Sequence, residues 1–163
     1  METASHRIGT RGFSLVELLV VIVIVSVLAS IGLPLAELAH RRQQEAELQT
    51  ALRTLRDALD AYKRSVDEGH ITRDAGASGY PPSLQALVDG VEDAKSPVRA
   101  KLYFLRRIPR DPLAPPDIEF AADTWGLRSY DSPPNAPREG KDVYDVYSKA
   151  DGAGLNGVPY RQW

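Results

Sequence analysis

The feature that most constrains this chain is an uninterrupted apolar run near its N-terminus. Residues 13–33 read FSLVELLVVIVIVSVLASIGL and contain one charged side chain, Glu17. A helix made from these 21 residues would be roughly 31 Å long, close to the thickness of the hydrocarbon core of a bilayer. The run therefore predicts a membrane-spanning helix over residues 13–34.

A cleaved secretory signal is the first alternative for this segment, with Val27, Leu28 and Ala29 as its cleavage site. Two observations disfavour that alternative. The run is longer than the usual apolar region of a signal, which has roughly 7 to 15 residues, and such a region is normally free of charge. A carboxylate inside a membrane helix is unfavourable unless it is neutralised, so Glu17 is the first candidate functional residue. The simpler alternative is that Glu17 lies among the lipid headgroups.

A second helical pattern follows over residues 35–68. Apolar side chains recur at alternating spacings of four and three, which predicts one apolar stripe along a helix: Leu48, Leu52, Leu55, Leu59, Tyr62 and Val66. Opposite charges four residues apart, such as Arg56 with Asp60, indicate a solvated helix face, or ion pairs between subunits. Because the stripe is too short for a typical coiled coil, we expect it to pack on the rest of the chain. Gly69 marks the expected end of the helix.

The remaining residues, 69–163, predict a small α+β head. Eleven of the 12 prolines lie in residues 80–163, so the elements there must be short. We expect a short helix from Ser83 to Val88 and a second helix that starts at Ser96-Pro97 and ends at Pro109. β-Forming residues predict antiparallel strands within 124–130 and 142–148.

Composition argues against catalysis and against nucleic-acid binding. The chain has no cysteine, its three histidines are far apart, and it contains no phosphate-binding loop or nucleophile motif, so we expect no enzyme. A net charge of −2 is unsuited to binding a polyanion. Arg106, Arg107 and Arg110 are interpreted as cations at a helix C-terminus, with a nucleic-acid or partner patch as the alternative.

The N-terminal residues RGFSLVEL, 11–18, resemble the processing motif of type IV pilins and of the pseudopilins of type II secretion. The resemblance implies that residues 1–12 are a leader, that a prepilin peptidase cuts after Gly12, and that the new amine of Phe13 is methylated. Pro34 stands where the family commonly has a proline. In a filament, Glu17 could pair with the Phe13 amine of a neighbouring subunit, which would give each buried charge a partner on assembly.

Later segments resemble the major pseudopilin branch of type II secretion. In chain order they are YPPSLQAL at 80–87, IPRDP at 108–112, WG followed by Tyr130, DVYS at 145–148 with Asp151-Gly152, and the final Trp163. This resemblance implies a type IV pilin-like fold, in which a long N-terminal helix, half transmembrane and half amphipathic, packs on a small antiparallel sheet.

The same resemblance implies a structural subunit of the type II secretion pseudopilus, a short periplasmic filament that drives protein export. Its expected partners are copies of itself, other pseudopilins at the tip, prepilin peptidase, and an inner-membrane assembly platform with its ATPase. The expected location is the inner membrane, crossed once, with the head in the periplasm. Two alternatives stay open: a minor type IV pilin for adhesion or DNA uptake, and a membrane-anchored periplasmic domain that binds calcium or another ligand.

Two departures from that branch affect the expected site. Residues 113–124 form an insertion, interpreted as a surface loop. The branch also implies a Ca²⁺ site, for which Ser148, Asp151 and Asn156 could supply oxygens. Lys149 adds a positive charge among these residues, and the glycine-rich segment around them is equally compatible with an ordinary turn.

Overall fold

The computed structural model describes residues 14–163, without the side chains of residues 31–34. Gly12, Phe13 and the side chain of Pro34, three of the predicted site features, lie outside this part of the chain. The chain divides into two compact units, one ending at Arg41 and the other comprising Arg42–Trp163. Each unit is described by itself.

Helix α1, Leu15–Asp67, corresponds closely to the helix predicted over residues 13–68. Its N-terminal end is marked by a hydrogen bond of 3.1 Å from the Leu18 amide to the Ser14 carbonyl. The helix is long and apolar enough near its N-terminus to cross a membrane, by length and composition. The apolar side chains of residues 15–28 are exposed, as expected for a surface that meets lipid.

Glycine ends α1 where the sequence predicts. Gly69 has a φ of 77°, a left-handed conformation that favours glycine. Its amide donates to the Val66 carbonyl at 2.9 Å, and the His70 amide donates to the Ser65 carbonyl at 2.8 Å. These bonds satisfy the last carbonyls of the helix in the manner of a glycine C-cap.

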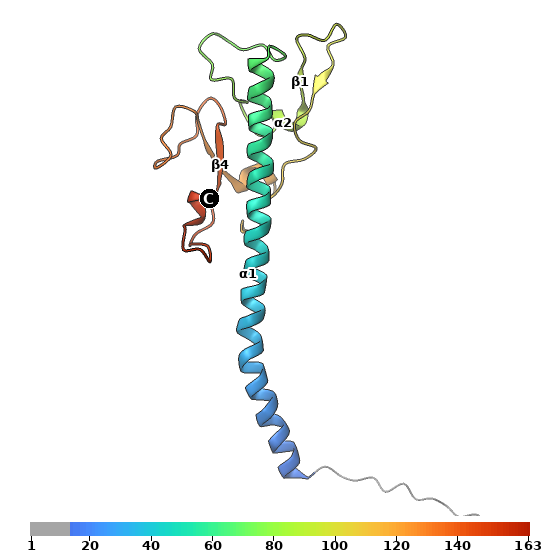
Figure 1. Ribbon diagram of the computed structural model, residues 1–163, viewed down its shortest axis with the longest axis vertical. Coiled ribbons are helices and arrows are strands. Elements are labelled where there is room, and N and C mark those ends of the chain that lie inside the picture. Colours follow the sequence, from blue (N-terminus) through green and yellow to red (C-terminus); the bar gives the residue numbers. More distant parts are fainter. Residues whose placement is uncertain (1–13) are drawn as a thin grey trace, which may run out of the picture. The chain divides into compact units, whose positions relative to one another are not determined.

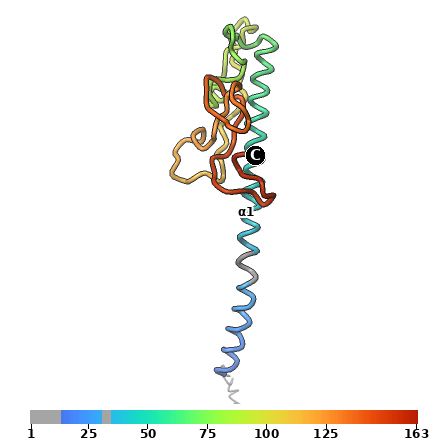
Figure 2. Tube along the Cα trace, turned by 90° about the vertical axis from the view of Figure 1, so that its left-hand side faces the viewer, coloured from blue at the N-terminus to red at the C-terminus, as the bar shows by residue number. Residues whose placement is uncertain are grey.

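The predicted apolar stripe forms the α1 side of the hydrophobic core in the second unit. Every member of the stripe is buried, from 0% exposed at Leu48 and Leu55 to 9% at Val66. It packs with Leu84, Leu87, Trp125, Val143, Val146 and Tyr160. Figure 1 and Figure 2 both show the later segments lying against the part of α1 that belongs to this unit. The stripe is therefore covered by this chain itself, which confirms the expected packing.

The elements after α1 are short, and their pairing is antiparallel. In chain order they are α2 (Ala86–Asp89), β1 (Val91–Glu92), β2 (Lys101–Leu102), the 3-10 helix η1 (Ala121–Thr124), β3 (Trp125–Arg128), β4 (Asp145–Ser148) and the 3-10 helix η2 (Tyr160–Gln162). β1 pairs with β2, and β3 pairs with β4 in a register that places Trp125 opposite Ser148 and Arg128 opposite Asp145. The long helix and these small antiparallel sheets confirm the predicted α+β, pilin-like fold.

The helix predicted to start at Ser96-Pro97 is wrong. Ser96 begins a turn: its hydroxyl accepts the Ala100 amide at 3.1 Å, and Arg99 takes a φ of 50°. The chain then enters β2, which pairs with β1. The pairing of β2 with β1 therefore outweighs the local preference for a helix. Leu102 packs against the core from β2, and Leu105 packs against it from the loop that follows. The nearby α2 also starts later than predicted, at Ala86, so its N-cap is Gln85 and not Ser83.

The insertion at residues 113–124 is mostly loop, as expected, and it ends in η1. Arg110 donates from its guanidinium to the carbonyl oxygens of Pro115 and Ile118, at 2.5 and 2.6 Å. At the far end, Lys149 Nζ donates to the Asp123 carbonyl at 3.2 Å. Arg110 thus binds this loop and does not cap a helix C-terminus, which corrects the interpretation of the basic cluster.

Candidate functional site

The first candidate site is the N-terminal end of α1. Glu17 lies in the first turn of this helix, where the unpaired amides and the helix dipole favour a negative charge. Its side chain is exposed. The apolar side chains that follow it along the helix are exposed as well, between 45% and 65% for Leu18, Leu19, Val20, Val21, Ile22, Val23, Ile24, Val25, Val27 and Leu28. The site thus combines one anionic group with an apolar surface.

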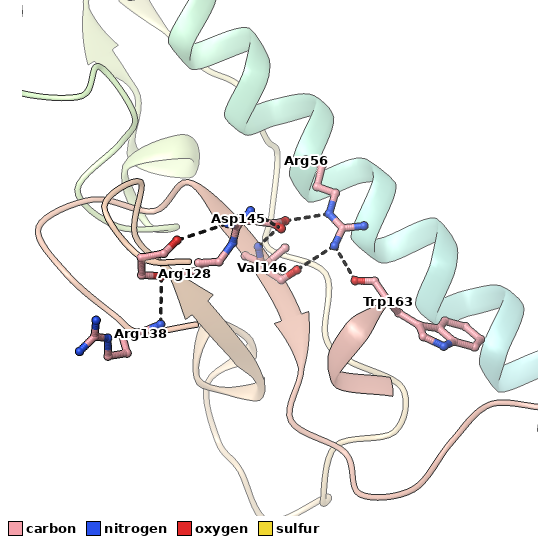
Figure 3. Close-up of polar contacts among 7 residues, drawn as sticks. Arg56, Arg128, Arg138, Asp145, Val146 and Trp163 are labelled. Atoms are coloured by element: carbon pink, nitrogen blue, oxygen red, sulfur yellow. Dashed lines mark hydrogen bonds and ion pairs between the residues drawn. The ribbon is translucent and has the colours of Figure 1, made fainter. Parts of the chain in front are cut away.

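The second candidate site lies within the second unit, where α1 meets β4 and the C-terminal residues (Figure 3). Arg56 projects from α1 and donates to three acceptors. Its Nε bonds to Asp145 Oδ1 at 2.8 Å, and one terminal nitrogen bonds to the main-chain oxygens of Val146, at 3.1 Å, and Trp163, at 2.6 Å. We call Arg56, Asp145, Val146 and Trp163 the C-terminal junction.

Arg128 on β3 extends the C-terminal junction. It donates to the second carboxylate oxygen of Asp145 at 3.2 Å, so this carboxylate is shared by guanidinium groups from α1 and β3. The Arg128 guanidinium also lies 4.6 Å from the centre of the Tyr144 ring, a cation–π contact. Figure 3 shows the two arginines on either side of Asp145. These two ion pairs link β4 to α1 and to β3 within this unit.

A buried polar group supports the same strand from its other end. The Ser148 hydroxyl donates to Asp111 Oδ2 at 2.6 Å, and both residues are almost completely buried. Asp111 Oδ1 accepts the Leu113 amide at 2.8 Å, and the Asp111 amide donates to the Thr124 hydroxyl at 3.1 Å. A buried carboxylate needs such donors, and these bonds also close the base of the insertion.

The three predicted calcium ligands have other protein partners. The Ser148 hydroxyl, besides donating to Asp111, accepts the Ala150 amide at 3.1 Å. The Asp151 side chain is fully exposed and lies 3.8 Å from the Arg161 guanidinium, and Asn156 Oδ1 accepts the Val158 amide at 3.0 Å. A calcium ion needs 6 to 8 oxygens. Residues placed in this way do not fit such an ion, and titration with Ca²⁺ tests the calcium site that the resemblance implies.

The remaining acidic and histidine side chains of the described chain were also compared with the requirements of a metal site. Between residues 14 and 163, no group of three or more histidine, aspartate or glutamate side chains is placed to hold a metal ion.

Asp142 closes a loop beside a cluster of tyrosines. The rings of Tyr80, Tyr130 and Tyr144 contact one another with centres 4.9 to 6.1 Å apart. Asp142 Oδ1 accepts the Ser129 hydroxyl at 2.6 Å and the Tyr130 amide at 3.0 Å. Burial raises the pKa of the Asp142 carboxyl, but the hydrogen bonds from Ser129, Ser78 and the Tyr130 amide outweigh it, so the pKa is lowered overall from 3.8.

This lowered pKa predicts how stability depends on pH. Because the pKa of Asp142 is lower in the folded state, its contribution is complete above 3.8 and is lost as pH falls through the folded-state pKa. We expect the unfolding free energy of the wild type to fall more steeply in this acidic range than that of Asp142→Asn. Urea denaturation at a series of pH values measures the difference, with the exposed Asp131→Asn as control. Parallel curves for the wild type and Asp142→Asn would contradict the assignment.

Sequence reasoning missed Arg56, Asp111 and Asp145. The pattern assigned Arg56 to a local pair with Asp60, whereas the structure directs it to Asp145, 89 residues later. The segments around Asp111 and Ser148 belong to the resemblance, but nothing in the sequence predicts that these two residues contact each other. Both segments contain an aspartate, but the residue type alone does not identify its partner.

The long N-terminal helix and the small antiparallel sheets define a pilin-like fold, and the comparisons agree. Residues 8–33 match the family described as the prokaryotic N-terminal methylation motif. Type II secretion system core protein G of Escherichia coli (strain K12) is 34% identical over 106 residues, which cover 63% of this chain and 66% of that protein. The Klebsiella michiganensis protein of the same name is 32% identical over 111 residues, covering 66% of this chain and 70% of that protein.

A third relative of that name, from Klebsiella pneumoniae, is 34% identical over 106 residues, or 63% of this chain and 68% of that protein. The matches thus span about two thirds of each relative. No solved structure matches the chain. The chain belongs to the family of type II secretion system core protein G.

Proposed function

We propose that this chain is a structural subunit of a type II secretion pseudopilus, which polymerises into a short periplasmic filament and drives protein export. The proposal rests on two findings that occur together in this chain. The methylation motif covers the start of the apolar part of α1, and the wider sequence is similar to core protein G. The relatives' name favours secretion over the alternative of a minor type IV pilin.

The N-terminal residues would prepare the subunit for assembly. Prepilin peptidase would cut after Gly12, and methylation would follow on the amine of Phe13. The cut would leave that amine four residues before Glu17. Each buried charge costs free energy alone, so a subunit resting in the membrane would gain when the Glu17 carboxylate meets the amine of a neighbouring subunit.

The two units of the chain suit different tasks in this proposal. The apolar surface of residues 14–30 would anchor the subunit in the inner membrane and later pack against the same surface of its neighbours. The unit Arg42–Trp163 would lie in the periplasm. An inner-membrane platform and its ATPase would extract successive subunits, and growth of the filament would move folded substrates toward the outer membrane. Other pseudopilins would complete its tip.

Mass spectrometry of the mature N-terminus tests this proposal directly. We expect the purified chain to begin at Phe13 and to carry one methyl group on the Phe13 amine. Gly12→Ser provides a matched variant: the larger side chain next to the scissile bond should leave the leader attached and the amine unmethylated. An intact Met1 or a cut after Ala29 in the wild type would contradict the proposal and favour a plain membrane anchor or a secretory signal.

A further inference from the structure

The C-terminal loop, residues 152–160, is closed by its own main chain. The Gly154 amide donates to the Val158 carbonyl at 2.9 Å, the Gly157 amide to the Gly154 carbonyl at 2.8 Å, and the Tyr160 amide to the Gly152 carbonyl at 3.2 Å. Gly152 and Gly157 take φ values of 96° and 78°, which favour glycine. These bonds define the turn without help from an added group, but they do not attach it to the rest of the unit.

Glu45 on α1 supplies that attachment. Its Oε1 accepts the Leu155 amide and the Tyr160 hydroxyl, each at 2.9 Å. Glu45 is only 8% exposed, although glutamate is rarely buried without hydrogen-bond partners. Hydrogen bonds to an ionised carboxylate are roughly twice as strong as those between neutral groups. One oxygen of Glu45 thereby holds both the middle and the end of the C-terminal loop.

Arg56 holds the residues that follow the C-terminal loop. It lies 11 positions after Glu45, about three helical turns, so both side chains project from nearly the same side of α1. Arg56 donates to the main-chain oxygens of Trp163 and Val146 (Figure 3). The indole N–H of Trp163 donates back to the Val158 carbonyl at 3.1 Å, and its ring lies 5.3 Å from that of Tyr160.

The remaining contacts of the C-terminal loop leave little room for a bound ion. A Cβ atom added at Gly154 would come within 2.3 Å of the Trp163 ring and 2.8 Å of Asn156 Oδ1, so ring and backbone are in close contact there. Asn156 Oδ1 already accepts the Val158 amide, and Asp151 points to solvent. Of the oxygens expected to bind calcium, that of Asn156 is therefore engaged within the turn, that of Ser148 is engaged with Asp111 and the Ala150 amide, and those of Asp151 face solvent.

We propose that in this chain Glu45 and Arg56 of α1, and not a divalent cation, hold the C-terminal loop in place. The Glu45 carboxylate and the Arg56 guanidinium, on one face of α1, attach the C-terminal loop and the residues after it to the helix. A bound ion would make the same attachment through oxygen ligands. The inference concerns the order of one loop in the isolated chain. It is independent of the proposed role in a filament, and its test does not require assembly.

Hydrogen exchange followed by mass spectrometry, on the full chain in detergent, tests the proposal. In Glu45→Ala we expect the amides of residues 152–160 to exchange about 10-fold faster or more, while those of β3 and β4 keep their protection. The matched control is Glu47→Ala, because Glu47 is exposed on the same helix and its side chain contacts only Gln43 among the described hydrogen bonds. In the control, exchange in the C-terminal loop should not change.

A second experiment uses the wild-type chain, so its result stays interpretable even if the Glu45→Ala variant does not fold. Exchange in residues 152–160 should be the same with millimolar Ca²⁺ and with a calcium chelator, and calorimetric titration with Ca²⁺ should give no heat of binding. Faster exchange in the presence of chelator, or measurable calcium binding that protects the loop, would overturn the proposal. Unchanged protection of the loop in a folded Glu45→Ala variant would overturn it as well.

Discussion

Replacing Glu17 with glutamine is expected to abolish incorporation of this chain into filaments while leaving its insertion into the membrane intact. The apolar part of α1 that carries the chain into the bilayer does not change in this variant. The variant loses only the carboxylate at the first turn of the helix. In the assembled state, the amine of the neighbouring subunit's N-terminus would then be buried without a partner.

The expected size of this effect follows from the cost of a buried charge that has lost its partner. Breaking a buried ion pair by removing one member costs about 3–5 kcal/mol. Since about 1.4 kcal/mol corresponds to a factor of ten, each subunit would join the filament at least two orders of magnitude more weakly. Such a loss should reduce filaments below detection in cells that express only the variant.

The measurement is a complementation assay in which membrane fractionation and filament shearing are scored together. Glu37→Gln is the matched control, because Glu37 lies on the same helix, is exposed, and follows the apolar run. We expect the control to assemble normally and Glu17→Gln to be found only in membranes. Normal filaments from Glu17→Gln would show that this carboxylate is a headgroup-level charge with no part in assembly.

Replacing Trp125 with alanine is expected to lower the free energy of unfolding of the second unit by about 3–5 kcal/mol. Trp125 is only 1% exposed and belongs to the core that covers the stripe of α1. Its indole N–H donates to the Pro109 carbonyl at 2.8 Å. Alanine would therefore leave a large cavity and would also remove the donor of a carbonyl at the turn before the insertion.

Trp125→Phe separates these two contributions. Phenylalanine retains most of the buried apolar surface and loses the N–H donor, so we expect a cost of about 1–3 kcal/mol. Phe120→Ala is the control, because this aromatic ring is 64% exposed and its loss should change stability by no more than about 0.5 kcal/mol. Urea denaturation of the detergent-solubilised chains gives the three values. A cost for Trp125→Ala as small as that of Phe120→Ala would mean that the core does not depend on this residue.

The parts of the fold that could be predicted from sequence are those with a repeating local signal. The stripe from Leu48 to Val66 recurs with the period of a helix, and all of its members are buried. The β-forming residues around Trp125 and Val146 likewise mark β3 and β4. The stripe shows its burial in consecutive helical turns, and β4 shows it at alternate residues, so nothing distant is needed to interpret either pattern. In β3 the strand-forming residue types are the only local signal, because its buried residues, Trp125 and Gly126, are adjacent.

Prediction failed where two distant segments decide the outcome. Ser96-Pro97 is a good local start for a helix, but the ladder with β1 takes the following residues into β2 instead. Arg56 has Asp60 four residues away, yet Asp145, Val146 and Trp163 together offer it three acceptors. Nothing in the sequence around Glu45 indicates its contacts, because its partners, Leu155 and Tyr160, lie more than 100 residues later.

The insertion at residues 113–124 is held largely through its main chain, and Thr124 is its buried side-chain contact at the base. Arg110 and Lys149 hold it through the carbonyl oxygens of Pro115, Ile118 and Asp123. Carbonyl oxygens are common to every residue type, so substitutions along the loop do not remove these acceptors. Exposed side chains such as Phe120 can therefore change from one descendant to another at little cost in stability. The loop offers a surface on which new contacts can evolve without rebuilding the unit that carries it.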